Sequence, residues 1–113
     1  MNALTLPKPG DVVAINRDGR IKAGTVVEVV TVLGDTVVDV DTIPAGLMSY
    51  HPHEVAVVPT PAAGQQWRCL TDPDLVLVVE SASGPVADCR TLAGRPVNSV
   101  ILPGWYELIG GAL

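Results

Sequence analysis

Two histidines separated by one proline have the spacing that most resembles half of a metal site. His51 and His53 would project to the same side of an extended strand, where two neutral imidazoles could supply two of zinc's four ligands. No Cys-x-x-Cys pair and no third ligand lies nearby, and Glu54 would point the other way. We therefore expect exposed rings on a polar closing strand, with no metal ion and no cofactor.

The two cysteines, Cys69 and Cys89, lie at roughly matching positions in the second half of the chain. They could face one another across strands and form a disulfide, or stay reduced and pack as small hydrophobic side chains. A cytoplasmic site of synthesis favours the reduced form. That half contains no histidine to activate a catalytic thiol.

Three aspartates, Asp35, Asp39 and Asp41, concentrate acidic charge around one hairpin, and the last two share a face that could hold a hard cation. A solvated outer face explains the same pattern and is the interpretation we favour. The sequence has no phosphate-binding loop, dinucleotide fingerprint, nucleophile elbow or metalloprotease helix. We therefore do not expect an enzyme.

Charge disfavours nucleic acid as the main partner. The net charge is −5, and both halves are acidic: residues 1–60 carry four basic and seven acidic side chains, and residues 61–113 carry three and five. Arg17, Arg20 and Lys22 form one cationic patch beside the Asp18-Gly19 turn, but three cations release few counterions. We interpret this patch as a charged turn with at most weak affinity for nucleic acid.

Composition predicts β structure. Valine dominates the apolar residues, Pro and Gly are frequent, and 48% hydrophobic content excludes a disordered acidic tail. Residues 1–10 lack the apolar segment of a signal peptide, and no apolar run approaches the length of a membrane span. We expect cytoplasmic synthesis and no membrane partner.

The same order of predicted strands and turns occurs twice in the chain. Residues 10–58 and residues 64–109 each open with Gly and a short alternating strand, continue through a polar turn and a Val-rich strand, and close on a short strand. The sequence predicts a first domain at residues 1–58, including an N-terminal arm, and a second at residues 64–113. Residues 59–63 form a short, stiff Pro-rich linker between them.

Both halves resemble the small SH3-like barrels of the KOW and Tudor type. The resemblance lies in residues 10–13, 18–20, 24–29 and 51–55 of the first half and in residues 76–80 and 104–108 of the second. It implies an all-β fold of two tandem SH3-like β-barrels joined by the linker. Such barrels serve many functions, so the resemblance implies an architecture and leaves the chemistry open.

Two Val-rich segments are apolar on both faces. Strict alternation through residues 25–33 places Val27, Val29 and Leu33 on one face and Val26, Val30 and Val32 on the other, and residues 75–79 are apolar throughout. A strand with one face in water should instead alternate apolar and polar residues. We therefore expect the second face to be covered by the other barrel or by another molecule.

Aromatic residues are few. Trp67 is expected in a core, whereas Trp105 and Tyr106 follow a Pro-Gly turn and are expected to be partly exposed, as interface anchors often are. Tyr50 alone in the first half cannot build a methyl-lysine cage. The predicted interface residues are Val26, Val30, Val32, Trp105 and Tyr106.

These features favour a non-enzymatic structural or assembly protein that docks on a protein partner or self-associates. Small acidic β-barrel proteins of this kind resemble accessory proteins of bacteriophage virions, such as capsid decoration or head–tail components, which implies a place in the virion. Two alternatives stay open. One is a KOW/Tudor-like nucleic-acid-binding or transcription-associated regulator, and the other is a small inhibitor of a host protein.

Overall fold

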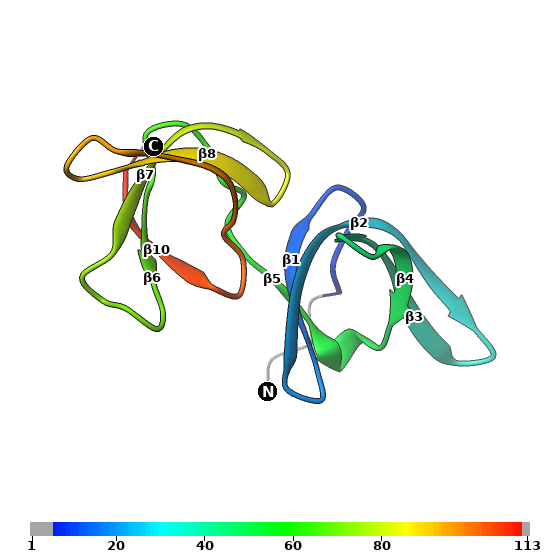
Figure 1. The fold of residues 1–113 in the computed structure, drawn as a ribbon. Helices are drawn as coiled ribbons and strands as arrows, with labels where there is room; N and C mark the ends of the chain where they lie inside the picture. The colour runs from blue at the N-terminus through cyan, green and yellow to red at the C-terminus, as the bar shows by residue number, and fades with distance from the viewer. Residues whose placement is uncertain (1–5, 112–113) are drawn as a thin grey trace. The chain divides into compact units, whose positions relative to one another are not determined.

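The computed structural model describes residues 6–111 of the chain (Figure 1). The chain divides into two compact units, unit 1 over residues 1–58 and unit 2 over residues 59–113. Each unit contains one five-stranded sheet with antiparallel pairing, so the predicted all-β class is confirmed. The predicted linker, residues 59–63, falls within unit 2. Of the predicted N-terminal arm, residues 1–5 lie outside the described residues.

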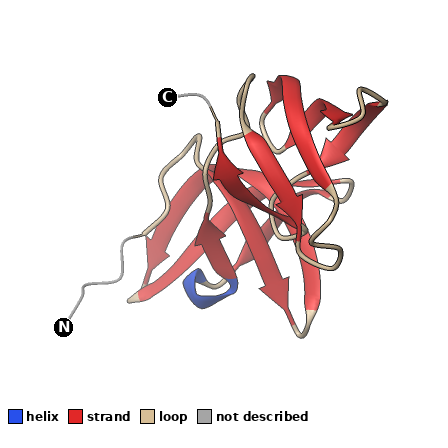
Figure 2. Ribbon diagram, turned by 90° about the vertical axis from the view of Figure 1, so that its left-hand side faces the viewer, coloured by secondary structure: helices blue, strands red, loops and turns tan. Residues whose placement is uncertain are grey.

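The sheet of unit 1 has the strand order β4-β3-β2-β1-β5. Its strands are β1 (Val12–Arg17), β2 (Arg20–Val32), β3 (Asp35–Ile43), β4 (Gly46–Tyr50) and β5 (Val55–Val57). One turn of 3-10 helix, η1 (Pro52–Glu54), separates β4 from β5 and is the blue segment in Figure 2. The last strand pairs with the first, so the ends of the unit are tied together.

The sheet of unit 2 repeats this order as β10-β6-β7-β8-β9. Its strands are β6 (Gln66–Cys69), β7 (Val76–Ser83), β8 (Val86–Thr91), β9 (Pro96–Ile101) and β10 (Tyr106–Gly110). Here too the last strand pairs with the first. In each unit, therefore, the first strand lies between the second and the last.

Each unit has its own hydrophobic core. The core of unit 1 consists of Val13, Ile15, Val26, Val38, Val40 and Tyr50, and that of unit 2 of Trp67, Leu77, Val79, Ala87, Cys89 and Leu102. Trp67 is 1% exposed, as predicted, and its Nε1–H donates to Gln65 Oε1 at 3.0 Å. Removing these side chains from water is the main favourable contribution to folding.

A β-bulge interrupts the alternation of β2. Val26 lies opposite Val40 and Glu28 lies opposite Asp39, so Val27 has no residue opposite it. One extra residue in a strand reverses the faces of every side chain beyond it. The strict alternation that we predicted through residues 25–33 is therefore wrong.

The bulge corrects the predicted set of interface valines. Val26 precedes the bulge and is buried in the core at 2% exposure, whereas Val30 and Val32 follow it and point away from the core. Val29 packs against the core in their place. Val26 therefore belongs to the interior of unit 1, because its backbone register differs by one residue from that of the other two valines.

Exchanging valine for its isosteric polar counterpart tests this assignment. Val26→Thr buries a hydroxyl group among apolar side chains, so it should lower the free energy of unfolding by about 1–3 kcal/mol. Val32→Thr keeps a β-branched side chain at an exposed position and should change it by less than about 0.5 kcal/mol. Urea denaturation measures both, and equal losses for the two variants would contradict the register described here.

Candidate functional site

The end of the β2–β3 hairpin extends past the core of unit 1 (Figure 1). We define the arm as residues 30–37, in which Val30 lies opposite Val37 and Val32 lies opposite Asp35. The core cluster and the side chains packed on it contain no arm residue. The arm is thus an ordered, valine-rich hairpin that adds little burial to its own unit.

The tip of the arm is the turn Leu33-Gly34. Both residues have positive φ, 53° and 83°, as in the type I′ turns that join two strands closely. The Asp18-Gly19 turn has nearly the same values, 54° and 80°, with an aspartate in first position. Asn and Asp tolerate this conformation, whereas a bulky side chain there is strained. Leu33 nonetheless occupies it with its side chain fully exposed, at 100%.

Leu33 is a surface residue that the sequence analysis assigned to the wrong face. Counting by alternation placed it with Val27 and Val29 and gave it no separate role. The signal lay in the dipeptide itself, since an apolar residue directly before Gly in a two-residue hairpin turn occupies a position that normally takes Asn, Asp or Gly. Val32, beside it, is 60% exposed and remains a candidate docking residue.

The outer face of the β2–β3 hairpin, in the arm and just before it, is both apolar and acidic. Val38 and Val40 are buried, so the side chains between and beside them in β3, Val37 and Asp39 among them, point outward. Glu28 lies directly opposite Asp39. Like charges at directly opposite positions destabilise a sheet. Asp39 Oδ1 accepts a hydrogen bond of 2.6 Å from Ser49 Oγ, which leaves Glu28 facing an anion.

The predicted cationic patch surrounds a hollow at the other end of β2. Arg17, Arg20 and Lys22 are brought together there with Asp18. The apolar lining consists of Ile15, Met48 and Tyr50, and the volume of the hollow is about 350 Å³. The patch is therefore a concave surface whose apolar floor is largely buried beneath it, which the sequence did not indicate.

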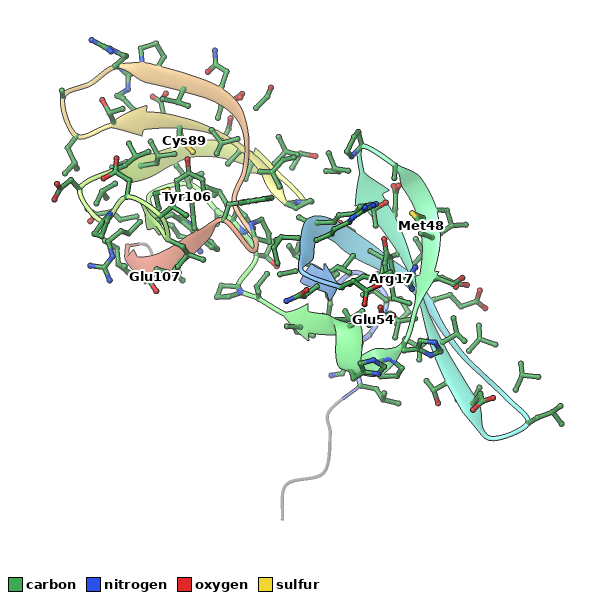
Figure 3. The ribbon with its side chains drawn as sticks, turned by 60° about the horizontal axis from the view of Figure 1, so that its bottom comes forward. Arg17, Met48, Glu54, Cys89, Tyr106 and Glu107 are labelled. Atoms are coloured by element: carbon green, nitrogen blue, oxygen red, sulfur yellow. The ribbon has the colours of Figure 1, made fainter. Side chains whose placement is uncertain are left out.

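Arg17 holds one side of this hollow. Its guanidinium group donates to both carboxylate oxygens of Glu54, at 2.8 and 3.0 Å, and to the backbone oxygen of Ser49 at 3.0 Å. The same group lies over the ring of Tyr50, 4.4 Å from its centre, a favourable cation–π position. Figure 3 shows Arg17 beside Glu54. One of the three patch cations is thus already paired, which lowers the positive charge available to a phosphate backbone.

The predicted extended strand at His51 and His53 is wrong. Pro52 begins the η1 turn, where its fixed φ is favourable, and the side chain of Glu54 accepts a hydrogen bond from the His51 N–H at 2.9 Å. The two imidazole rings stack with their centres 5.6 Å apart. Within residues 6–111, no group of three or more His, Cys, Asp or Glu residues could hold a metal ion.

Both cysteines are free. Cys69 lies in β6 and Cys89 in β8, with β7 between them in the sheet. Burial raises the pKa of the Cys89 thiol, and a hydrogen bond with the Thr71 hydroxyl lowers that of Cys69. Cys89 is a buried core residue and packs as a small hydrophobic side chain.

Trp105 and Tyr106 differ in their surroundings. Trp105 is 46% exposed, while its backbone oxygen accepts a hydrogen bond from the Leu70 N–H. Tyr106 packs against the core of unit 2, and burial raises the pKa of its phenol. Trp105 therefore remains available as a surface anchor, whereas Tyr106 mainly supports the core.

No protein-family model matches this chain, and no curated protein matches it significantly. Among the residues that the structure describes, no helix is long and apolar enough to cross a membrane. We therefore infer function from the arm, the hollow and the exposed Trp105.

The Arg17–Glu54 pair should make stability depend on acid pH. The hydrogen bond from Arg17, followed by that from the His51 backbone, lowers the pKa of Glu54 from 4.5 to about 2. Because the folded-state pKa is the lower one, this contribution is complete above about pH 4.5 and is lost as the pH falls toward 2. Glu54→Gln should lower the melting temperature at pH 7 and flatten its fall across this range.

The control for this experiment is Glu107→Gln, which removes a carboxylate from the exposed Arg68–Glu107 pair in unit 2. An exposed pair contributes little, so this variant should leave the pH profile almost unchanged. If Glu54→Gln and wild type lose the same number of degrees between pH 4.5 and pH 2, the Arg17–Glu54 pair does not stabilise unit 1.

Proposed function

We propose that this protein is a non-enzymatic assembly protein that docks on a larger protein structure through the arm. In this proposal each unit is a small SH3-like β-barrel. The shared strand order, the pairing of the last strand with the first and the η1 turn before β5 support that architecture. In this proposal the folded units position the exposed side chains that contact the partner.

The observation that carries this proposal is the exposed, conformationally strained leucine at the tip of the arm. Leu33 has no burial to lose on unfolding and occupies a backbone conformation that costs an L-residue about 1–2 kcal/mol. Folding of the chain alone does not account for a leucine at this position. Burial in a partner's pocket would contribute about 1.5–3 kcal/mol, which offsets the conformational cost of the turn.

A place in a bacteriophage virion, as a capsid decoration or head–tail component, is the setting we propose for this docking. Its support is the combination of compact units of small size, acidic charge, β structure and an apolar arm presented from one of the units. Exposed apolar residues gathered at one end of a hairpin are typical of contact surfaces.

A nucleic-acid-binding role is the second candidate, and the hollow with its three cations is the observation that favours it. Asp18 in its lining and the ion pair between Arg17 and Glu54 reduce the net positive charge. Binding of this class weakens steeply with added salt. Retention on immobilised RNA or DNA that Arg20→Ala abolishes would therefore favour this candidate over docking.

The variant Leu33→Asn separates folding from docking. Asn tolerates the left-handed conformation, so the free energy of unfolding should rise by about 0.5–1 kcal/mol. The same variant should no longer sediment with the large assemblies in lysates of producing cells, because it lacks the apolar side chain. Urea denaturation and quantitative co-sedimentation measure the two effects.

Leu92→Asn is the matched control, since Leu92 is 69% exposed in unit 2 and lies outside the arm. It should keep both the wild-type stability, within about 0.5 kcal/mol, and the wild-type co-sedimentation. Docking through the arm is disproved if Leu33→Asn sediments with the same assemblies as wild type, or if both leucine variants are lost from them equally.

A further inference from the structure

Unit 1 carries a protruding surface and a concave one whose chemistries are complementary. The arm presents exposed Val32 and Leu33, and the hollow has an apolar floor in which Met48 is partly exposed while Ile15 and Tyr50 are buried. An apolar cavity of about 150 Å³ already accommodates a benzene molecule. The hollow, at about 350 Å³, is therefore large enough for the side chain of a leucine.

The charges of the two surfaces are also opposite. Asp35 lies on the outer face of the arm, Glu28 and Asp39 lie on the same face of the hairpin just before the arm begins, and none of the three takes part in the ion pairs found among the described residues. Arg20 and Lys22 line the hollow and likewise have no carboxylate partner there. Bringing an arm to a hollow would pair these groups and relieve the repulsion between Glu28 and Asp39.

The tip of the arm follows the end of β2, whereas two of the cations that line the hollow lie at the start of that strand. The hollow includes Arg20, the first residue of β2, and the arm contains Val32, the last. Twelve residue steps along a straight strand span about 40 Å, and β2, which contains a bulge and curves in Figure 1, spans less. Figure 1 shows the corresponding two turns of unit 1 at separate ends. The tip of the arm and Arg20 therefore lie apart within one unit, and a complementary surface that could receive the arm would belong to another molecule.

We infer that copies of this chain associate head to tail, with the arm of one copy seated in the hollow of the next. Leu33 enters the hollow beside Met48, and the carboxylate of Asp35 meets Arg20 and Lys22. The contact is heterologous, because different surfaces of the two copies meet, so it propagates into a ring or an open filament. This inference rests on the proposed function and names the neighbouring copy as the partner that receives the arm.

Arg17 is a positioning residue for this contact. Its guanidinium group is fixed over Tyr50 and against Glu54, so it keeps one wall of the hollow in place. A foreign basic surface could satisfy the same arm, and a phosphate group could satisfy the same cations. The mixing experiment below distinguishes both occupants from a second copy.

Two variants, each defective in one surface, give the test. Leu33→Asn removes the apolar tip and keeps the hollow, whereas Arg20→Glu reverses a charge at the hollow and keeps the arm. In sedimentation velocity runs at concentrations up to millimolar, wild type should form a series of oligomers. Each variant alone should associate at least about tenfold more weakly. An equimolar mixture should form one intact interface and stop at a 1:1 dimer.

The controls are Leu92→Asn and Arg95→Glu, which make the same chemical changes at exposed positions of unit 2. Both should oligomerise as wild type does, and added salt should weaken association of all competent pairs. A wild-type chain that stays monomeric, or a mixture that gives no heterodimer, overturns the inference. If the chain does not self-associate but still requires Leu33 to sediment with larger assemblies, a foreign partner receives the arm and the proposed function stands. If Leu33 is dispensable for co-sedimentation as well, both the head-to-tail inference and the proposed function fail.

Discussion

The core of unit 1 accepts one face of each strand, and this steric limit determines where the surplus valines of β2 can go. Before the bulge, Val26 occupies the interior; after it, Val29 does so while Val30 and Val32 point outward. A β-bulge is the device that makes this exchange possible within one continuous strand. The arm exists because β2 and β3 continue to pair after the core has ended.

The two ends of β2 thereby acquire different chemistry. At its start, the guanidinium group of Arg17 packs on the ring of Tyr50 near Arg20. Glu54, in the η1 turn, forms an ion pair with the same guanidinium group. At its end, apolar and acidic side chains surround a strained leucine turn. Two different surfaces are thus present on one unit, and a contact between such surfaces on neighbouring copies, as we infer, would be heterologous.

Composition and turn chemistry predicted the β class, the core position of Trp67 and the exposure of Trp105, because these follow from local propensity and residue size. The bulge at Val27 was beyond prediction from alternation, since an inserted residue changes the register and leaves no local mark. Pro52 pointed to the η1 turn, but we interpreted residues 51–55 as extended. The hollow was missed for a different reason: its cations come from β1 and β2 and its floor partly from β4, so only the fold brings them together.

Shortening the arm tests the central claim that it serves a partner and not its own core. Replacing residues 31–36 with Asn-Gly preserves the register, because Val30 and Val37 occupy the same kind of pair as Val32 and Asp35. The decisive measurement is the fraction of this variant that sediments with the large assemblies of producing cells, with urea denaturation confirming that it is folded. The account predicts a folded protein that is absent from the assemblies. A folded variant that sediments as wild type does would contradict it.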